Sequence, residues 1–363
     1  MDNFRFDDEK LDYIDNSQRK EIIFDLFKRQ FLHNRENIPF YSKLYGHIDS
    51  DEIKSYEDCI EKIPLITKIN LRNLKSPYDL TSYKIQNNFD KIYIHRGTGG
   101  TTGEPVSMLF SYNDWQAILG GMTRSLKEIK ELKKHIVAYN GYHQGHISGP
   151  IFDDTIRKIG GTPVTRNFNS TDEQALKLMI KHRCNLIIAP SISTHKGGSV
   201  EDLLEIDAKL GLNYINGKNI DCIFCSSTNL TKELYTELME LGIKYIYNYY
   251  GSTDVLPTAI SCQENPLDLH ILPGHIAIFV VGKDGKHVKN GERGLVVASR
   301  IGSYDESGDI SVNEATQIMN FHVGDEVTFI DEPCSCGRTT PRIRDVKRVS
   351  FIKEKLESGC EVW

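Results

Sequence analysis

Thr98 to Gly103 gives the clearest chemical signal in the sequence, because all six positions are threonine or glycine. Glycine lets backbone amides approach an anion closely, and threonine hydroxyls can donate hydrogen bonds to it. A tight surface turn is the alternative, but turns rarely need six residues of these two types. Neither a P-loop ending nor a Gly-x-Gly-x-x-Gly turn is present. We predict a phosphate site at Thr98, Gly99, Gly100, Thr101, Thr102 and Gly103.

Cysteine and histidine form a second group with chemical potential. Cys262 and His270 are spaced Cys-x7-His, and Cys334 and Cys336 are spaced Cys-x-Cys. Four such ligands can close a tetrahedral zinc site, and closed four-ligand sites are structural. Buried thiols with a surface histidine are the alternative, because the spacing is not that of a standard zinc finger.

Cys222 and Cys225 resemble a redox pair, but they lie in an apolar run that reads as a strand. Positions i and i+3 of a strand face opposite sides of the sheet. We therefore predict that both are buried thiols of the core.

Short apolar runs alternate with amphipathic segments of helical length from about residue 93 onward. This alternation predicts an α/β body with a largely parallel sheet. The predicted strands are His135–Tyr139, Asn185–Ala189, Asp221–Cys225 and Lys244–Tyr249. The predicted helices are Tyr112–Leu132, Asp172–His182, Val200–Leu210 and Thr231–Leu241.

After Pro257 the pattern changes to strands and turns without long helices. His275–Val281, Gly294–Ser299 and Phe321–Ile330 predict antiparallel strands, with a turn at Gly282–Gly285 and a loop at Gly302–Gly308. The segment Ile301–Asn313 is the best candidate for a mobile loop. The predicted division is a helical region over 1–90, which includes an amphipathic helix at Ser17–Asn34, an α/β nucleotide-binding part over 91–255, a smaller β-rich part over 256–350 and a tail over 351–363.

Composition excludes several classes of protein. The 363 residues hold 44 basic and 50 acidic side chains, for a net charge of −6, and no block rich in Lys and Arg, which argues against nucleic-acid binding. Met1–Lys20 has no apolar segment of a secretory signal, and the longest apolar runs, such as Ile276–Val281, are too short to cross a bilayer. Eight cysteines are too few for a disulfide scaffold. We expect a cytoplasmic protein.

Several motifs together resemble the adenylate-forming enzymes, and within them the phenylacetate–coenzyme A ligase-like branch. Thr98–Pro105 is similar to the family's ATP-phosphate loop, although Glu104 stands where a lysine is usual. The other similar segments follow in the family's order: Ala189-Pro-Ser191, Phe224–Thr228, Asn248-Tyr-Tyr-Gly-Ser-Thr-Asp254 and His322-Val-Gly-Asp325. The resemblance implies a large body of mostly parallel sheets flanked by helices, with a smaller antiparallel part.

The resemblance also implies roles for individual residues. Tyr249 or Tyr250 would face the adenine, Thr253 the α-phosphate, Asp254 a magnesium ion and Asp325 the ribose hydroxyls. Further nucleotide contacts are implied for Ser226, Ser227, Asn248, Gly251 and Ser252. Taken alone, Asp254 is equally well a solvated strand-end or helix-cap carboxylate, and Asp325 is better read as an ordinary turn residue.

Tyr139–His146 lies where the family builds its carboxylate pocket, so Tyr142, His143 and His146 are candidate substrate contacts. An ordinary polar loop is the alternative, and we expect only one of the two histidines to reach the pocket. Cys334-Ser-Cys-Gly-Arg-Thr is close to a signature of the same branch, which strengthens the expectation of structural Zn²⁺.

The family normally continues through a hinge into a C-terminal domain that brings an adenylation lysine. Here Asp345–Ser350 stands at the hinge, where Arg348 could keep a ribose-binding role, and only 13 residues follow Ser350, too few for a domain. We therefore expect a chain without the mobile domain, and this departure puts coenzyme A transfer in doubt.

Together these features predict an enzyme that uses ATP and Mg²⁺ to activate a small, aromatic or acyl, carboxylic acid as its acyl-adenylate. The adenylate would pass to a separate carrier protein, reductase or transferase. Two alternatives stay open: acyl transfer onto a protein, as in acyl-protein synthetases, and a degenerate partner protein that binds nucleotide or acid without turnover. A homodimer is a further expectation.

Overall fold

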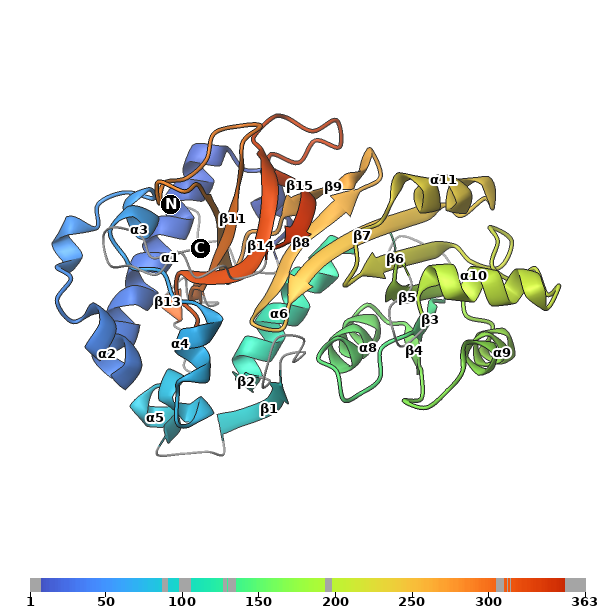
Figure 1. Ribbon diagram of the computed structural model, residues 1–363, viewed down its shortest axis with the longest axis horizontal. Coiled ribbons are helices and arrows are strands. Elements are labelled where there is room, and N and C mark those ends of the chain that lie inside the picture. The colour runs from blue at the N-terminus through green and yellow to red at the C-terminus, as the bar shows by residue number, and fades with distance from the viewer. Residues whose placement is uncertain are drawn as a thin grey trace.

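A computed structural model describes residues 8–86, 91–97, 106–126, 129, 135–192, 198–304, 310, 311, 313 and 315–349. Its first part is helical, with η1 (Glu9–Asp12), α1 (Asn16–Asn37), α2 (Pro39–Tyr45), η2 (Ser50–Glu52), α3 (Asp58–Glu61), α4 (Lys68–Arg72), η3 (Pro77–Leu80) and α5 (Tyr83–Gln86). In Figure 1, helices α1 to α5 lie on the side of the molecule that holds β11 (Arg293–Arg300) and β14 (Phe321–Ile330), away from α9 (Asp172–His182) and α10 (Val200–Lys209).

The predicted amphipathic helix at Ser17–Asn34 is confirmed as α1. Asp15 caps its N-terminus by accepting a hydrogen bond of 2.8 Å from the backbone N–H of Ser17. The helix ends before Ile38, because the following Pro39 disfavours the helical backbone at the residue before it.

The predicted parallel sheet is confirmed. Strands β4 (Thr162–Thr165), β3 (Val137–Asn140), β5 (Leu186–Pro190), β6 (Cys222–Ser226) and β7 (Tyr245–Ser252) lie side by side in that order, all parallel. The helices around them are α6 (Tyr112–Ser125), α8 (Ser148–Lys158), α9 (Asp172–His182), α10 (Val200–Lys209) and α11 (Lys232–Glu240), of which α8 to α11 flank the strands in Figure 1.

Two elements of this half were not predicted. Helix α8 begins with Ser-Gly-Pro, which reads as a loop, but proline is tolerated in the first turn of a helix. Strand β4 contains Pro163, which is compatible with its place at the edge of the sheet. The helix predicted over 112–132 ends at Ser125, and most of the remaining stretch lies outside the described residues.

The predicted antiparallel strands continue the same sheet instead of forming a separate one. Strand β7 pairs in parallel with β6 on one side and antiparallel with β8 on the other, so the sheet has 11 strands. After β7 the order is β8 (Val255–Cys262), β9 (Asn265–Ile271), β15 (Arg342–Arg348), β14 (Phe321–Ile330), β11 (Arg293–Arg300) and β10 (Ile276–Val281). Two small pairs complete the fold: β1 (Ile92–Gly97) with β2 (Ser107–Ser111), and β12 (Ser303–Tyr304) with β13 (Ile310–Ser311).

Alternate residues of the parallel strands fill two separate cores. Ile187 packs in the cluster with α9, α10 and α11, whereas Ile188 packs in the larger cluster that includes α6, α8 and the antiparallel strands. Cys222 belongs to the larger cluster and Cys225 to the smaller one, and both are fully buried. The prediction that they are core thiols on opposite faces is therefore confirmed. Among the described residues, no helix is long and apolar enough to cross a bilayer.

Candidate active site and metal centre

A cavity of about 470 Å³ opens at the carboxyl ends of β6 and β7. This is where the sheet changes from parallel to antiparallel pairing, and crevices at such switch points commonly bind ligands. The cavity wall includes most of the predicted nucleotide and substrate residues: His146, Ser226, Ser227, Asn248, Tyr249, Tyr250, Gly251, Ser252, Thr253, Asp254, Asp325 and Arg348.

Hydrogen bonds between strand ends hold one wall of the cavity in place. The Ser191 hydroxyl donates to the backbone carbonyls of Thr228 (2.9 Å) and Asn229 (2.8 Å), and the Ser191 N–H donates to Thr228 Oγ1 at 2.9 Å. These bonds tie the end of β5 to the segment after β6. Two of the segments that suggested the family resemblance are thus in direct contact.

Tyr142 connects the loop after β3 with the same wall. Its hydroxyl donates to Ser227 Oγ at 2.9 Å and lies 3.0 Å from Ser226 Oγ. Burial raises the pKa of Tyr142, so the phenol stays protonated and remains a hydrogen-bond donor. Its ring stacks on His146, with centroids 5.6 Å apart.

The two predicted histidines separate. His146 lines the cavity, but His143 packs edge-on against the exposed Phe168, at 4.7 Å between ring centroids, and is not part of the cavity wall. One histidine therefore lines the cavity and the other does not, and a contact between His146 and the substrate stays a prediction.

Asp153, which the sequence analysis missed, organises this loop from helix α8. Its buried carboxylate accepts hydrogen bonds from Asn140 (2.8 Å), Gln144 (2.6 Å) and Thr165 (2.7 Å). Asn140 in turn accepts the backbone N–H of Tyr142 at 3.1 Å. An aspartate within an amphipathic helix carries no signal of this role, because its partners come from separate strands and loops.

The two candidate tyrosines have different neighbours. Tyr249 packs against Phe152 and Phe224, at 6.1 and 5.6 Å between centroids, whereas the Tyr250 hydroxyl donates to Asp325 Oδ2 at 2.7 Å. Both tyrosines line the cavity. Gly251 must be glycine, because a Cβ there would lie 2.7 Å from the Tyr249 hydroxyl.

Asp325 is a buried strand residue and not the ordinary turn residue that its motif alone suggested. It lies in β14, is 7% exposed, and accepts hydrogen bonds from Tyr250 and, at 3.0 Å, from Arg348 Nη1. The preceding Gly324 has φ +94°, and a Cβ there would meet the Arg348 guanidinium at 3.3 Å. Burial and the neighbouring Asp325 raise the pKa of Tyr250, so its phenol also stays a donor.

Asp254 is the most deeply buried carboxylate of the cavity, at 1% exposure. Its Oδ2 accepts the Ser252 hydroxyl at 2.8 Å and lies 3.7 Å from Lys68 Nζ. Its Oδ1 has no hydrogen-bond partner among the described residues. A buried, unshared carboxylate oxygen beside serine and threonine hydroxyls fits a hard cation such as Mg²⁺. The alternative of a solvated carboxylate is wrong.

The predicted phosphate loop Thr98–Gly103 lies outside the described residues. The strands on either side of it form an antiparallel pair in which Gly97 is opposite Ser107.

The predicted metal ligands come together at one end of the antiparallel half. The ligand atoms of Cys262, His270, Cys334 and Cys336 all lie within 4.8 Å of one another. A tetrahedral zinc ion with Zn–S bonds of about 2.3 Å and a Zn–N bond of about 2.0 Å gives edges of about 3.8 Å (S–S) and 3.5 Å (S–N). The Cys262–Cys334 sulfur distance is 3.7 Å, and Cys336 Sγ lies 3.4 Å from His270 Nε2. The geometry therefore fits zinc.

The surroundings of this Cys/His cluster also suit a metal. His270 Nδ1 lies 3.2 Å from the backbone carbonyl and 2.9 Å from the hydroxyl of Thr340. A carbonyl can only accept, so Nδ1 carries the proton and the Nε2 lone pair faces the sulfurs. Hydrogen bonding from Cys262 lowers the pKa of Cys336, which favours a thiolate there.

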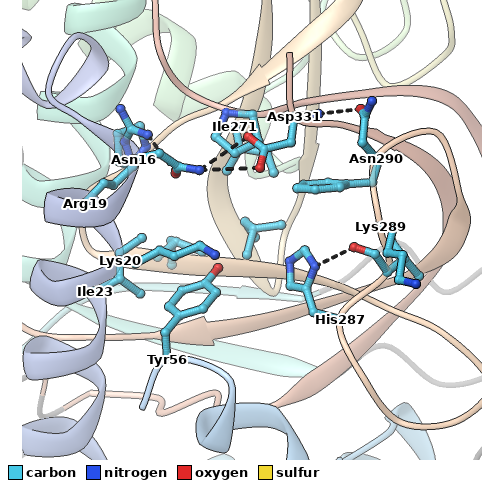
Figure 2. A pocket seen from close by; sticks show the side chains of 16 residues that line it. Asn16, Arg19, Lys20, Ile23, Tyr56, Ile271, His287, Lys289, Asn290 and Asp331 are labelled. Atoms are coloured by element: carbon cyan, nitrogen blue, oxygen red, sulfur yellow. Dashed lines mark hydrogen bonds between the residues drawn. The ribbon is translucent and has the colours of Figure 1, made fainter. Parts of the chain in front are cut away.

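A second cavity, of about 300 Å³, lies between α1 and the antiparallel strands (Figure 2). Asn16 donates to Asp331 across its rim at 3.3 Å, and Lys20 on its wall pairs with Glu57 at 3.6 Å. None of the predicted functional residues that the structure describes lines it. Its lysine and aspartate are therefore useful controls for substitutions in the first cavity.

Comparison with known proteins supports the resemblance seen in the sequence. No family model matches the chain. A phenylacetate–coenzyme A ligase of Thermus thermophilus is 23% identical over 323 residues, which cover 87% of this chain and 67% of that protein.

Solved structures give the same result for the fold. 2-Hydroxyisobutyryl-CoA ligase, in complex with 2-HIB-AMP and CoA, matches with a TM-score of 0.81 at 16% identity, over 94% of this chain and 70% of that chain. Its open conformation gives a TM-score of 0.78 at 15% identity, over 92% and 75% of the two chains. The predicted resemblance to the phenylacetate–coenzyme A ligase branch and the α/β fold of the adenylate-forming enzymes are both confirmed.

Proposed function

We propose that this chain, a relative of phenylacetate–coenzyme A ligase with the adenylate-forming fold, is a ligase that binds ATP with Mg²⁺ and activates a small carboxylic acid as its acyl-adenylate. One observation carries the proposal. The buried Asp254, with its unshared oxygen, and the Tyr250–Asp325–Arg348 group line one cavity at the switch point of the sheet.

Different residues of the cavity wall are suited to the ribose, the adenine and the phosphates of ATP. Asp325 still has lone pairs for ribose hydroxyls after accepting Tyr250 and Arg348, because a carboxylate offers about four acceptor sites. Tyr249 and Tyr250 provide aromatic surface for the adenine. Thr253 on the cavity wall would provide a hydroxyl donor for phosphate oxygens, and the sequence of Thr98–Gly103, which lies outside the described residues, suggests further donors.

Attack of a carboxylate on the α-phosphorus gathers negative charge, so catalysis depends on fixed donors and cations. Asp254, with the neighbouring Ser252 and Thr253, would hold Mg²⁺, which neutralises phosphate charge when bound. The chain's own residues orient the nucleotide and hold this carboxylate in a buried position.

The acid would lie against His146, which lines the cavity and stacks on the ring of Tyr142 behind the wall. The relatives are named for different acids, an aromatic one and a short hydroxy acid. A small aromatic or acyl acid is therefore our proposal for this chain. Coenzyme A is a candidate acceptor by analogy with these relatives, beside a carrier protein, a reductase or a transferase.

Pyrophosphate exchange and hydroxamate formation test the proposal. Phenylacetate and 2-hydroxyisobutyrate head a panel of aromatic and aliphatic acids, assayed with ATP and Mg²⁺. We expect exchange with at least one small acid and none without acid. Tight ATP binding without pyrophosphate exchange for any acid would indicate a nucleotide-binding protein and would overturn the proposal of an adenylating enzyme. Adding coenzyme A then shows whether thioester forms, and intact-mass measurement detects an acyl group moved onto a protein side chain.

We also infer that Cys262, His270, Cys334 and Cys336 hold a structural Zn²⁺. All four positions are filled by protein ligands, so no site is left open for water or substrate. The ion would join the β8–β9 hairpin to the segment between β14 and β15, far along the chain from it.

A further inference from the structure

Lys68 brings a positive charge into the candidate active site from the N-terminal helical region. It lines the cavity, is 8% exposed, and its ammonium lies 3.7 Å from Asp254 Oδ2. Nothing in its sequence context, Thr-Lys-Ile-Asn, marks it as functional. Only the fold brings it to Asp254.

A short backbone connection explains how Lys68 reaches the cavity. The Ile66 N–H donates to the carbonyl of Asn320 at 2.8 Å, and the His322 N–H donates to the carbonyl of Ile66 at 2.8 Å. Ile66 thus pairs in parallel with Phe321 at the start of β14. The helix that begins at Lys68 is therefore fixed beside the strand that carries Asp325.

The side chain of Asn320 strengthens this connection. Its Nδ2 donates to the carbonyls of Cys59 (2.6 Å) and Ile63 (3.1 Å), on the chain segment that leads to Lys68. Asn320 has a φ of 47°, a left-handed conformation that asparagine tolerates better than most residues. The position of Lys68 is thus determined by buried polar contacts.

The contact between Lys68 and Asp254 is an ion pair without a hydrogen bond, because 3.7 Å exceeds hydrogen-bond length. A buried carboxylate needs a compensating charge, and Lys68 supplies the paired one, with the buried Arg300 adding a second positive charge that interacts with Asp254. The ammonium has three donors, and no hydrogen bond from it to a described residue is formed. Because Lys68 lines the cavity, its ammonium can reach a ligand bound there.

We infer that Lys68 has two successive partners. In the nucleotide-free protein its ammonium neutralises Asp254. When Mg²⁺ and ATP bind, the metal takes over the neutralisation of Asp254, and Lys68 turns to the phosphate oxygens of the nucleotide. Lysine suits this change because its ammonium is a compact point charge on a flexible stem. The inference rests on the proposed function, and it makes Lys68 a nucleotide ligand contributed by the N-terminal region.

Metal binding without nucleotide tests the first half. Mn²⁺ replaces Mg²⁺, and its binding is followed by electron paramagnetic resonance. We expect Lys68→Met to bind Mn²⁺ at least tenfold more tightly than the wild type, because the competing ammonium is gone. Lys68→Arg, which keeps the charge, should stay near the wild type, and Lys68→Met with Asp254→Asn should lose the gain. Unchanged Mn²⁺ affinity in folded Lys68→Met would overturn the inference.

Calorimetric titration with ATP and Mg²⁺ tests the second half. Lys68→Met should weaken ATP binding at least tenfold, and Lys68→Arg should weaken it less. Lys20→Met is the matched control, since this lysine also pairs with a carboxylate, that of Glu57, but lies on the second cavity (Figure 2). Equal ATP affinity in wild type and Lys68→Met would overturn the role in phosphate binding.

The two tests separate this inference from the proposed function. Suppose that the wild type shows no pyrophosphate exchange but that Lys68→Met binds Mn²⁺ more tightly. The proposed adenylation activity is then wrong, whereas the inference that Lys68 pairs with Asp254 is supported. If Lys68→Met does not fold, Lys68→Gln replaces it in both titrations, because glutamine is polar and keeps hydrogen-bonding capacity. A Lys68→Gln protein that matches the wild type in both titrations would also overturn the inference.

Discussion

Asp254 and Asp325 are both buried carboxylates of one cavity, yet their surroundings suit them to different tasks. Asp325 is already held by the phenol of Tyr250 and the guanidinium of Arg348, so its orientation is fixed and it can accept further hydroxyl donors. Asp254 keeps one oxygen without a hydrogen-bond partner among the described residues, and its charge is compensated by an ion pair with Lys68 and by the charge of the buried Arg300. The first suits ribose hydroxyls and the second a metal ion.

At the residue scale, we predict that Asp325→Asn weakens ATP binding about 10- to 100-fold, because a hydrogen bond to a charged group contributes about 1.5–3 kcal/mol. The preference of the wild type for ATP over 2′-deoxy-ATP should shrink in the variant, since the carboxylate that accepts the ribose hydroxyl is gone. Calorimetric titration of both nucleotides measures this. Asp331→Asn, on the second cavity (Figure 2), is the control and should bind like the wild type. An undiminished preference for ATP would contradict the ribose role.

At the element scale, pairs of strands depend on contacts far apart in the sequence. The β8–β9 hairpin and the segment between β14 and β15 meet through the Cys/His cluster, next to the position where Arg342 of β15 pairs with His270 of β9. Asp268 accepts hydrogen bonds from Arg342 (2.7 Å) and Arg344 (2.9 Å) beside it. Zinc would add a covalent-strength link to this end of the sheet.

We predict that protein purified without chelators contains about one zinc ion per chain, as expected for a single closed site. His270→Ala should lower the zinc content severely and lower the thermal unfolding temperature, because three thiolates would remain without their fourth ligand. Metal analysis and calorimetry measure the two effects. Cys222→Ala is the matched control, since this cysteine is buried in the core outside the Cys/His cluster, and its zinc content should not change. Zinc-free wild-type protein from such a preparation would contradict the assignment.

At the scale of the whole molecule, the 11-stranded sheet joins the parallel and antiparallel halves, and the folded protein buries a histidine whose protonation depends on pH. His275 is fully enclosed near Arg300 and Arg124, and burial lowers its pKa to about 3. The folded protein therefore keeps this histidine neutral over most of the acidic range, whereas the unfolded chain protonates it below about pH 6.5. Stability from this group is complete above pH 6.5 and is lost as the pH falls toward 3.

We predict that His275→Gln reduces the loss of unfolding free energy between pH 7 and pH 5 by about 2 kcal/mol, because glutamine does not titrate. Its amide can still donate a hydrogen bond, so the variant should fold. Urea unfolding at the two pH values measures the difference. Exposed His182→Gln is the control and should leave the pH dependence unchanged. The same pH dependence in His275→Gln and wild type would show that His275 does not titrate as described.

Secondary structure and short motifs were predictable from the sequence, because both depend on residues that are close together along the chain. The alternation of apolar runs and amphipathic segments indicated the α/β fold, since periodicity depends only on which face each residue presents. Residue types were sufficient to nominate the four members of the Cys/His cluster, whereas the Asn248–Asp254 motif was nominated by the family resemblance. The strand at β4 and the helix at α8 were missed because Pro163 and the Ser-Gly-Pro start of α8 are locally indistinguishable from loops.

Only the tertiary structure decided which nominated residues meet. In the fold, His146 lines the cavity, whereas His143 packs against Phe168. The Tyr250 hydroxyl donates to Asp325, and Lys68 lies beside Asp254. The physical reason is that these contacts depend on how the sheet turns from parallel to antiparallel and on how Ile66 pairs with β14. Sequence spacing carries no record of such pairings, because side chains that are distant along the chain become neighbours only when the core is packed.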